Sequence, residues 1–229
     1  IKKMKLTFYG HACFGLEIDG ISILLDPFIS PNPLAKHIDI NAIKADYILL
    51  SHGHEDHVAD ALYLAKKNDA IIVSNFEIVS WFSSKGHTKG HPMNIGGKKD
   101  FGSFSVKYVN AVHSSVLPDG SNGGNPGGFL IKKGDKCIYF AGDTALNSDM
   151  KILGEFEKIN VAILPIGDNF TMGIEDASLA AQFINCNKVI GMHYNTFPYI
   201  EIDKNDAINY FRERKQELIL VEIGENLDI

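Results

Sequence analysis

The segment Ser-His-Gly-His-Glu-Asp-His at residues 51–57 limits what this chain can fold into more than any other feature. Three imidazoles and two carboxylates fall within a few positions, directly after the apolar run 47–50, which is typical of a buried strand. Imidazole is the commonest nitrogen ligand of zinc and related ions, and carboxylate adds a harder oxygen ligand. Because a buried strand fixes where the segment leaves its sheet, we predict a metal site rather than a chance collection of polar loop residues.

The spacing inside this segment predicts two neighbouring metal positions. His52 and His54 flank a glycine, so both can turn toward one ion. Asp56 and His57 are adjacent, and a tight turn can direct them to a second ion beside the first. Glu55 is expected to point to solvent.

Composition narrows the class of protein. The chain has 229 residues, of which 45% are hydrophobic, and no low-complexity linker divides it, so we expect one domain over 1–229. Three widely separated cysteines without a Cys-x-x-Cys pair indicate a reducing, cytoplasmic setting and argue against a thiolate zinc site. A formal net charge of -6 gives no excess of positive charge for binding nucleic acid. No apolar run is long enough for membrane insertion.

Apolar periodicity and turn residues predict the order of strands and helices. Expected strands cover 5–8, 16–18, 21–25, 47–50, 70–73, 101–112, 129–131, 137–140, 161–164, 188–190 and 218–223. Expected helices cover 60–67, 149–159, 175–186 and 203–217, with a further helix from 76 that ends at Gly86. Residues 85–99 are expected to be a turn-rich connection. Hairpins followed by strand–helix alternation occur in each half, which favours an α/β (α+β) fold of two packed sheets with helices outside.

Further histidines and an aspartate follow other predicted strands at their carboxyl ends. These residues are His113, Asp143 and His193. Side chains at strand ends converge on one rim of a sandwich, so we expect them to join His52, His54, Asp56 and His57 there. Seven ligands suit two metal ions with room left for water.

At this point the sequence resembles the metallo-β-lactamase superfamily, through the His52-x-His54-x-Asp56-His57 motif and the three later ligands. The segments 10–14, 26–28, 124–128 and 171–173 look like a family of small bacterial and archaeal metal-dependent hydrolases of uncharacterised substrate. That family is related to the ascorbate-6-phosphate lactonases. The resemblance implies a four-layer αβ/βα sandwich of two mixed sheets with a dinuclear site at one edge.

The resemblance also implies a division of the ligands. His52, His54 and His113 would hold the first metal. Asp56, His57 and His193 would hold the second, and Asp143 would bridge the two. Lactamases proper often carry cysteine where this chain has Asp143, which weakens an antibiotic-hydrolysing reading.

Two adjacent divalent ions would make a metal-bridged hydroxide available at neutral pH for attack on a small ester, lactone or phosphoester. Zinc suits this histidine-rich set, and the carboxylates also permit manganese or iron. Asp56 is expected to orient the nucleophile or accept its proton. His11 either binds substrate or protonates a leaving group at the same rim, or is a structural histidine in a turn. Asp26 either orients a ligand histidine through its second ring nitrogen or caps an Asp-Pro turn.

Two other functions stay open beside a hydrolase of a small-molecule substrate. A metal-dependent nuclease or phosphodiesterase is less favoured, because 22 basic residues face 28 acidic ones without a Lys/Arg block. A non-catalytic metal-binding module is the other alternative, and a homo-oligomer is left open. In the Gly-rich segment 114–128, glycines 123, 124, 127 and 128 are expected to form a flexible wall of the site, whereas His37, His87 and His91 are expected at the surface.

Overall fold

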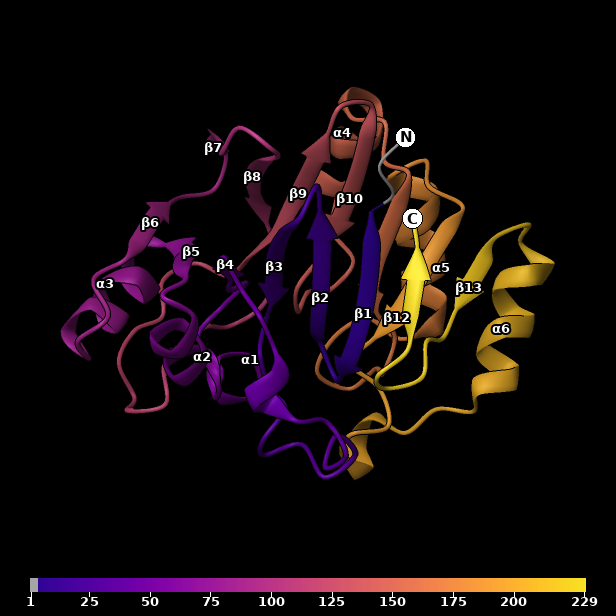
Figure 1. Cartoon of the computed structure of the whole chain (residues 1–229). Helices are drawn as coiled ribbons and strands as arrows, with labels where there is room; N and C mark the ends of the chain where they lie inside the picture. Colours follow the sequence, from indigo (N-terminus) through magenta and orange to yellow (C-terminus); the bar gives the residue numbers. More distant parts are fainter. Residues whose placement is uncertain (1–3) are drawn as a thin grey trace.

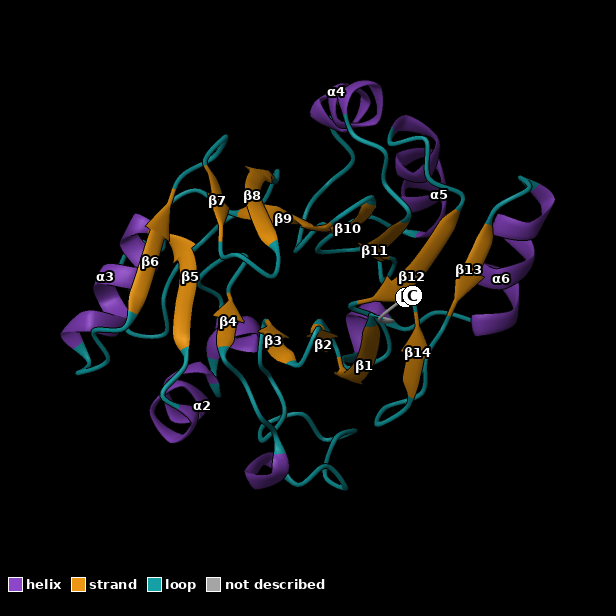
Figure 2. Ribbon diagram, turned by 45° about the horizontal axis from the view of Figure 1, so that its top comes forward, coloured by secondary structure: helices purple, strands orange, loops and turns teal. Residues whose placement is uncertain are grey.

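Two seven-stranded β-sheets pack face to face, and helices cover their outer surfaces, as the computed structural model in Figures 1 and 2 shows. The structure describes residues 4–229. The predicted α/β sandwich of two mixed sheets is confirmed.

The first sheet combines an antiparallel half with a parallel half. It contains β1 (Lys5–Gly10), β2 (Cys13–Ile18), β3 (Ile21–Leu25), β4 (Tyr47–Leu49), β5 (Ile71–Asn75), β6 (Gly90–Met93) and β14 (Asn226–Asp228), in the order β14-β1-β2-β3-β4-β5-β6. Strands β14 to β3 pair antiparallel, and β3 to β6 pair parallel. Asp19 and Gly20 have φ angles of 52° and 84°, as the predicted hairpin turn between β2 and β3 requires.

The second sheet repeats this plan. It contains β7 (Lys98–Asp100), β8 (Ser105–Asn110), β9 (Gly127–Lys133), β10 (Lys136–Phe140), β11 (Val161–Pro165), β12 (Lys188–Met192) and β13 (Glu217–Ile219), in the order β13-β12-β11-β10-β9-β8-β7. Strands β7 to β10 pair antiparallel, and β10 to β13 pair parallel. The parallel strands of both sheets place their carboxyl ends at one rim of the sandwich.

The helices follow the parallel strands and lie outside the sheets (Figure 2). They are α1 (Glu55–Val58), α2 (Ala61–Asn68), α3 (Phe76–Ser84), α4 (Asp149–Phe156), α5 (Ile174–Phe183) and α6 (Lys204–Glu213), with short 3-10 turns η1 (Ile40–Ala42) and η2 (Pro198–Ile200). No helix formed by residues 4–229 combines the length and apolar character that crossing a bilayer requires.

Apolar burial holds these layers together. Between the sheets, the rings of Phe14 and Phe140 meet edge to face with centroids 6.4 Å apart. A second core lies between the first sheet and its helices, where Ile48, Leu64 and Phe82 are almost fully buried. Burial of each such side chain stabilises the fold by about 1.5–3 kcal/mol. These two cores hold the sheets and helices together, and so they set the positions of the strand ends at the rim.

The structure differs from the sequence prediction where strands are short or polar. The segment 85–99 contains β6 and the start of β7, and α1 begins inside the histidine motif. The expected strand 218–223 is shorter and is followed by the separate strand β14. The helix expected to reach residue 217 ends at Glu213, because Lys215 has a φ angle of 59° that no helix continues. Edge strands such as β7, with all three residues exposed, carry no apolar alternation to detect.

Candidate metal centre

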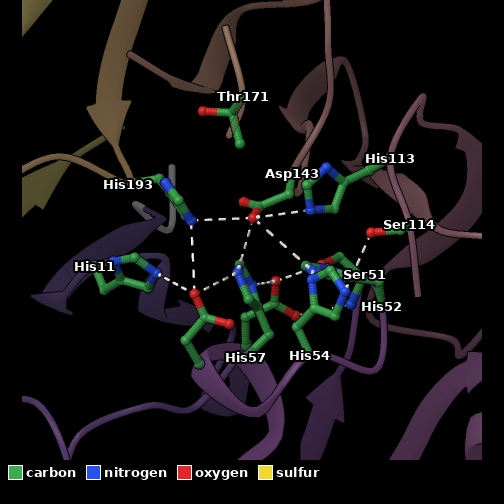
Figure 3. Close-up of polar contacts among 12 residues, drawn as sticks. His11, Ser51, His52, His54, His57, His113, Ser114, Asp143, Thr171 and His193 are labelled. Carbon is green, nitrogen blue, oxygen red and sulfur yellow. Dashed lines mark hydrogen bonds and ion pairs between the residues drawn. The ribbon is translucent and has the colours of Figure 1, made fainter. Parts of the chain in front are cut away.

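The seven candidate ligands predicted from the sequence meet at one rim of the sandwich (Figure 3). They emerge from loops that follow strands of both sheets. After β4 come His52 and His54, and Asp56 and His57 lie in α1; His113 follows β8, Asp143 follows β10, and His193 follows β12. Residues far apart in sequence therefore converge because strand ends meet at this rim.

The side chains form two main groups, and a third set of close ligand atoms, from Asp26, His52 and His57, overlaps both. In the first group, ring nitrogens of His52, His54 and His113 all lie within 4.8 Å of one another. In the second group, Asp56, His57 and His193 are similarly close, and His11 joins them.

Asp143 lies between the two groups. Its Oδ2 atom is 3.2 Å from His57 Nε2 and 3.0 Å from His193 Nε2. The same atom is 3.9 Å from His52 Nε2 and 3.6 Å from His113 Nε2. One carboxylate oxygen thus reaches imidazoles of both groups.

A close approach of the two sheets brings Asp143 to this position. The preceding Gly142 has a φ angle of 62°, and a Cβ atom there would lie 2.6 Å from Ser51 Cβ. Glycine is therefore required both by the backbone conformation and by the contact with the other sheet.

Asp26 orients two of the histidines from behind. Its Oδ2 atom is 2.7 Å from His57 Nδ1 and accepts a 2.5 Å hydrogen bond from the Ser51 hydroxyl. The Ser51 oxygen is 2.9 Å from His52 Nδ1, and it accepts from that nitrogen because its own proton goes to Asp26. Both imidazoles therefore direct Nε2 toward the centre of the cluster, where that of His52 lies 2.9 Å from His54 Nδ1 and that of His57 lies 3.2 Å from Asp143 Oδ2. The sequence pointed to Asp26, whereas Ser51 was missed.

His11 reaches the rim but lies behind Asp56. Its Nε2 is 3.0 Å from Asp56 Oδ2, and its Nδ1 is 2.9 Å from Thr196 Oγ1. The residue is 2% exposed and does not line the cavity in front of the cluster. Burial, reinforced by neighbouring His193, lowers the pKa of His11 to about 4. The imidazole is therefore neutral at physiological pH.

The first group consists of neutral imidazoles. Burial lowers the pKa of His52, His54 and His113. Neutral imidazole is the form that binds metal, so these three nitrogens are ready as ligands without losing a proton.

The second group concentrates charge. Burial works against ionisation of Asp56 and Asp143, yet the adjacent imidazoles hold the pKa of both carboxyl groups well below the usual range. Burial also works against a charge on His57 and His193, but the carboxylates outweigh it and raise the pKa of both, that of His193 to about 9. The buried carboxylates of Asp56 and Asp143 are thus stabilised as anions by positive charge beside them.

Unpaired polar atoms show that these residues fit a divalent metal. Among the described residues, Asp143 Oδ1 is buried without a hydrogen-bond partner, and His57 Nε2 makes no hydrogen bond although Asp143 Oδ2 lies 3.2 Å away. Leaving such atoms unpaired costs roughly 1–3 kcal/mol each. Imidazole and carboxylate are also the donors that zinc, manganese and iron accept. A cation in this cluster would satisfy both the charge and the unpaired atoms.

A cavity of about 260 Å³ lies in front of the cluster. Its lining consists of five candidate ligands, one serine and two aromatic rings: His54, Asp56, His113, Asp143, His193, Ser114, Phe170 and Phe197. The Gly-rich segment contributes Ser114, whose hydroxyl is 3.3 Å from His54 Nε2, but none of the glycines expected to form a wall lines this cavity. Sequence reasoning missed both phenylalanines, because nothing in their local pattern marks them.

The remaining histidines stay apart from the centre. His37 is exposed and His91 is half-buried in β6. The expectation of a surface position is wrong for His87, which is buried and bonds the Ala70 carbonyl oxygen through Nε2 at 2.9 Å. Glu55 is exposed, as predicted.

Comparisons with known proteins place this fold and site in a family. A model described as the β-lactamase superfamily domain matches residues 5–193. A "UPF0173 metal-dependent hydrolase" of Christiangramia forsetii is 54% identical over 99% of this chain and 100% of its own length. A namesake from Methylacidiphilum infernorum is 47% identical over 98% of this chain and 99% of its own.

A solved structure agrees with these relatives. The metallo hydrolase Igni18 from the hyperthermophilic archaeon Ignicoccus hospitalis superposes with a TM-score of 0.90 at 36% identity, covering 100% of this chain and 99% of its own. The chain therefore belongs to the metallo-β-lactamase superfamily, within the family of these metal-dependent hydrolases.

Proposed function

We propose that this protein is a dinuclear metal-dependent hydrolase of a small ester, lactone or phosphoester, with zinc as the first choice of metal. The position of Asp143 Oδ2, within 3.0–3.9 Å of imidazoles from both groups, carries the proposal. The relatives are named metal-dependent hydrolase and metallo hydrolase, which supports the reaction class.

Each half of the cluster has the donors for one ion. One position would use His52, His54 and His113, and the other Asp56, His57 and His193, with Asp143 shared. When bound, two divalent ions supply an acidified water molecule and polarise the carbonyl or phosphoryl oxygen of the substrate.

Asp56 is the protein group placed to handle the nucleophile. Its carboxylate lines the cavity and stays ionised, because adjacent imidazoles depress its pKa. An ionised carboxylate at the cavity wall can orient a water molecule and accept its proton.

His11 serves as a positioning residue for Asp56. The ionised Asp56 can only accept a hydrogen bond, so the proton of neutral His11 resides on Nε2. Nδ1 then accepts from the hydroxyl of Thr196. This chain of two hydrogen bonds fixes the direction of the Asp56 carboxylate from the buried side.

The test is metal content together with hydrolysis. Protein purified without chelator or an affinity-tag metal should contain about two equivalents of zinc or manganese per chain by elemental analysis. The loaded protein should then hydrolyse members of a panel of esters, lactones and phosphoesters.

Two results would contradict the proposal in different ways. One equivalent or none, even after metal is added back, would rule out the dinuclear arrangement. Two equivalents without hydrolysis across the panel would favour the metal-binding module instead.

A further inference from the structure

We infer that the substrate is uncharged apart from its reacting group and places a small apolar or aromatic group between Phe170 and Phe197. This inference rests on the proposed hydrolase function and names its substrate class. It is carried by the cavity in front of the cluster and by the charges around it.

Beyond the candidate ligands, the cavity wall consists of two aromatic rings and one serine. Only Ser114, Phe170 and Phe197 complete the lining, and none of the lining residues is lysine or arginine. A volume of about 260 Å³ lies just below the usual range for ligand sites, so the group held there is small.

The two rings differ in how firmly they are held. Phe197 packs edge to face on His11, with centroids 5.2 Å apart, and also contacts Phe28 at 6.3 Å. Phe170 is 52% exposed and meets the ring of Tyr199 at 6.1 Å. Phe197 is therefore a fixed wall, and Phe170 lines the cavity with much of its surface free to contact a ligand.

The surroundings disfavour an additional anionic group on the substrate. A separate, larger cavity of about 830 Å³ lies along α5 and α6, and Tyr199, which contacts Phe170, is part of its lining. Its lining includes six acidic residues: Asp168, Glu175, Asp176, Glu201, Asp203 and Asp206. Recognition of phosphate or carboxylate normally uses arginine, lysine or an unoccupied helix N-terminus. The nearby N-terminus of α5 instead carries Glu175 and Asp176 in its first turn.

An anionic substituent held away from the metal positions would therefore lose water and gain no lysine or arginine in exchange, at a free-energy cost. A neutral phenyl or branched alkyl group would bury apolar surface against two rings. Among esters, lactones and phosphoesters, this selects those without charge outside the reacting group and argues against a phosphorylated lactone.

The experiment compares two aryl esters that differ in one charge. Phenyl acetate and 4-acetoxybenzoate share the scissile bond, and each rate is divided by the rate of hydroxide-catalysed hydrolysis of the same ester. With metal-loaded protein, kcat/KM for phenyl acetate should exceed that for 4-acetoxybenzoate by about tenfold or more.

Variants connect this preference to Phe170. Phe170→Ala should lower kcat/KM for phenyl acetate by about tenfold. Phe170→Lys should shift the ratio toward 4-acetoxybenzoate. The matched control is Phe156→Ala, which removes a ring that is 79% exposed at the end of α4 and should leave both rates unchanged.

The outcomes separate this inference from the proposed function. Equal or faster hydrolysis of 4-acetoxybenzoate would overturn the inference while the hydrolase function stands. Hydrolysis of neither ester, nor of any other compound in the panel, would contradict the function. Calorimetric binding of benzamide then decides the inference alone: weaker binding to Phe170→Ala than to Phe156→Ala supports it, and equal binding overturns it.

Discussion

Asp143 is the residue whose replacement should change the centre most. Asp143→Asn keeps the size of the side chain but removes the charge that both groups of histidines face. We expect metal content to fall from about two equivalents to one or fewer, and hydrolysis to fall by more than about 100-fold, beyond the usual effect of an outer hydrogen-bond partner. Elemental analysis and steady-state kinetics measure both quantities.

Asp149→Asn is the control. This carboxylate, on the first residue of α4, accepts a hydrogen bond from Asn110 Nδ2 and is not one of the candidate ligands. Full metal content and activity in Asp143→Asn would show that the shared position is misassigned.

Asp26 should affect metal affinity without binding metal itself. Asp26→Asn removes the anion that fixes His57 directly and His52 through Ser51. Outer partners of this kind typically change metal affinity by about 10–100-fold. Competition with a chromogenic chelator measures the change, and Asp39→Asn, which alters only an exposed cap, is the control. Unaltered affinity in Asp26→Asn would remove its positioning role.

At this scale the sequence identified the candidate ligands but not the residues that support them. The ligands stand directly after predicted strands, where their chemistry and position coincide. Ser51, Thr196, Phe170 and Phe197 act through contacts with distant segments, and their residue types are ordinary in loops. Only the folded structure brings Thr196 to His11 or Phe197 to the cavity.

At the scale of elements, the buried residue Asn75, at the end of β5, is hydrogen-bonded both to α3 and to the Gly-rich segment. Its side-chain oxygen accepts from Ile78 N at the start of α3, and its amide donates to the carbonyl oxygens of Gly123 and Asn125. Asn75→Ala should lower the free energy of unfolding by about 2 kcal/mol, since a helix cap and two buried partners are lost. Urea denaturation measures the loss.

Limited proteolysis of the Asn75→Ala variant should also show faster cleavage within 114–126. Asp203→Ala removes the cap of α6, which is exposed, and should cost about 1 kcal/mol with no change in that cleavage. Equal cleavage in both variants would show that Asn75 does not hold the segment.

The prediction of elements succeeded where burial imposes a pattern. Strands such as β10 and β11 are largely apolar, and their positions follow from sequence. Strands β6, β7 and β14 lie at the sheet edges and are largely exposed, so their pairing rests on backbone hydrogen bonds, which leave little trace in the side-chain pattern. Helix α1 is only one turn long and too short for periodicity to reveal.

For the whole molecule, metal removal should lower thermal stability. An ion that binds only the native state at about 100 times its Kd contributes about 2.7 kcal/mol, which corresponds to a Tm shift of about 5–10 °C for a chain of this size. Scanning calorimetry before and after chelation, and again after zinc is restored, measures the shift. An unchanged Tm despite a change in metal content would mean that the ions do not stabilise the native state.

The sandwich itself was predictable from hairpins followed by strand–helix alternation, together with the resemblance. Strand order was not, because periodicity does not specify partners. The parallel pairing of β3 with β4 and the return of β14 to β1 are decided by contacts across the whole chain.

Because the candidate ligands come from both sheets, a bound metal would affect how far the two sheets can separate transiently. Any transient separation of the sheets at the rim must move His52 away from Asp143, so bound metal would oppose opening at that end and leave the opposite end unaffected. The backbone amides of Leu50 and Ala141, at the rim ends of β4 and β10, bond the carbonyl oxygens of Val73 and Ile163. Hydrogen exchange at these two amides should slow when metal is added, while amides at the far ends of the same strands keep their rates.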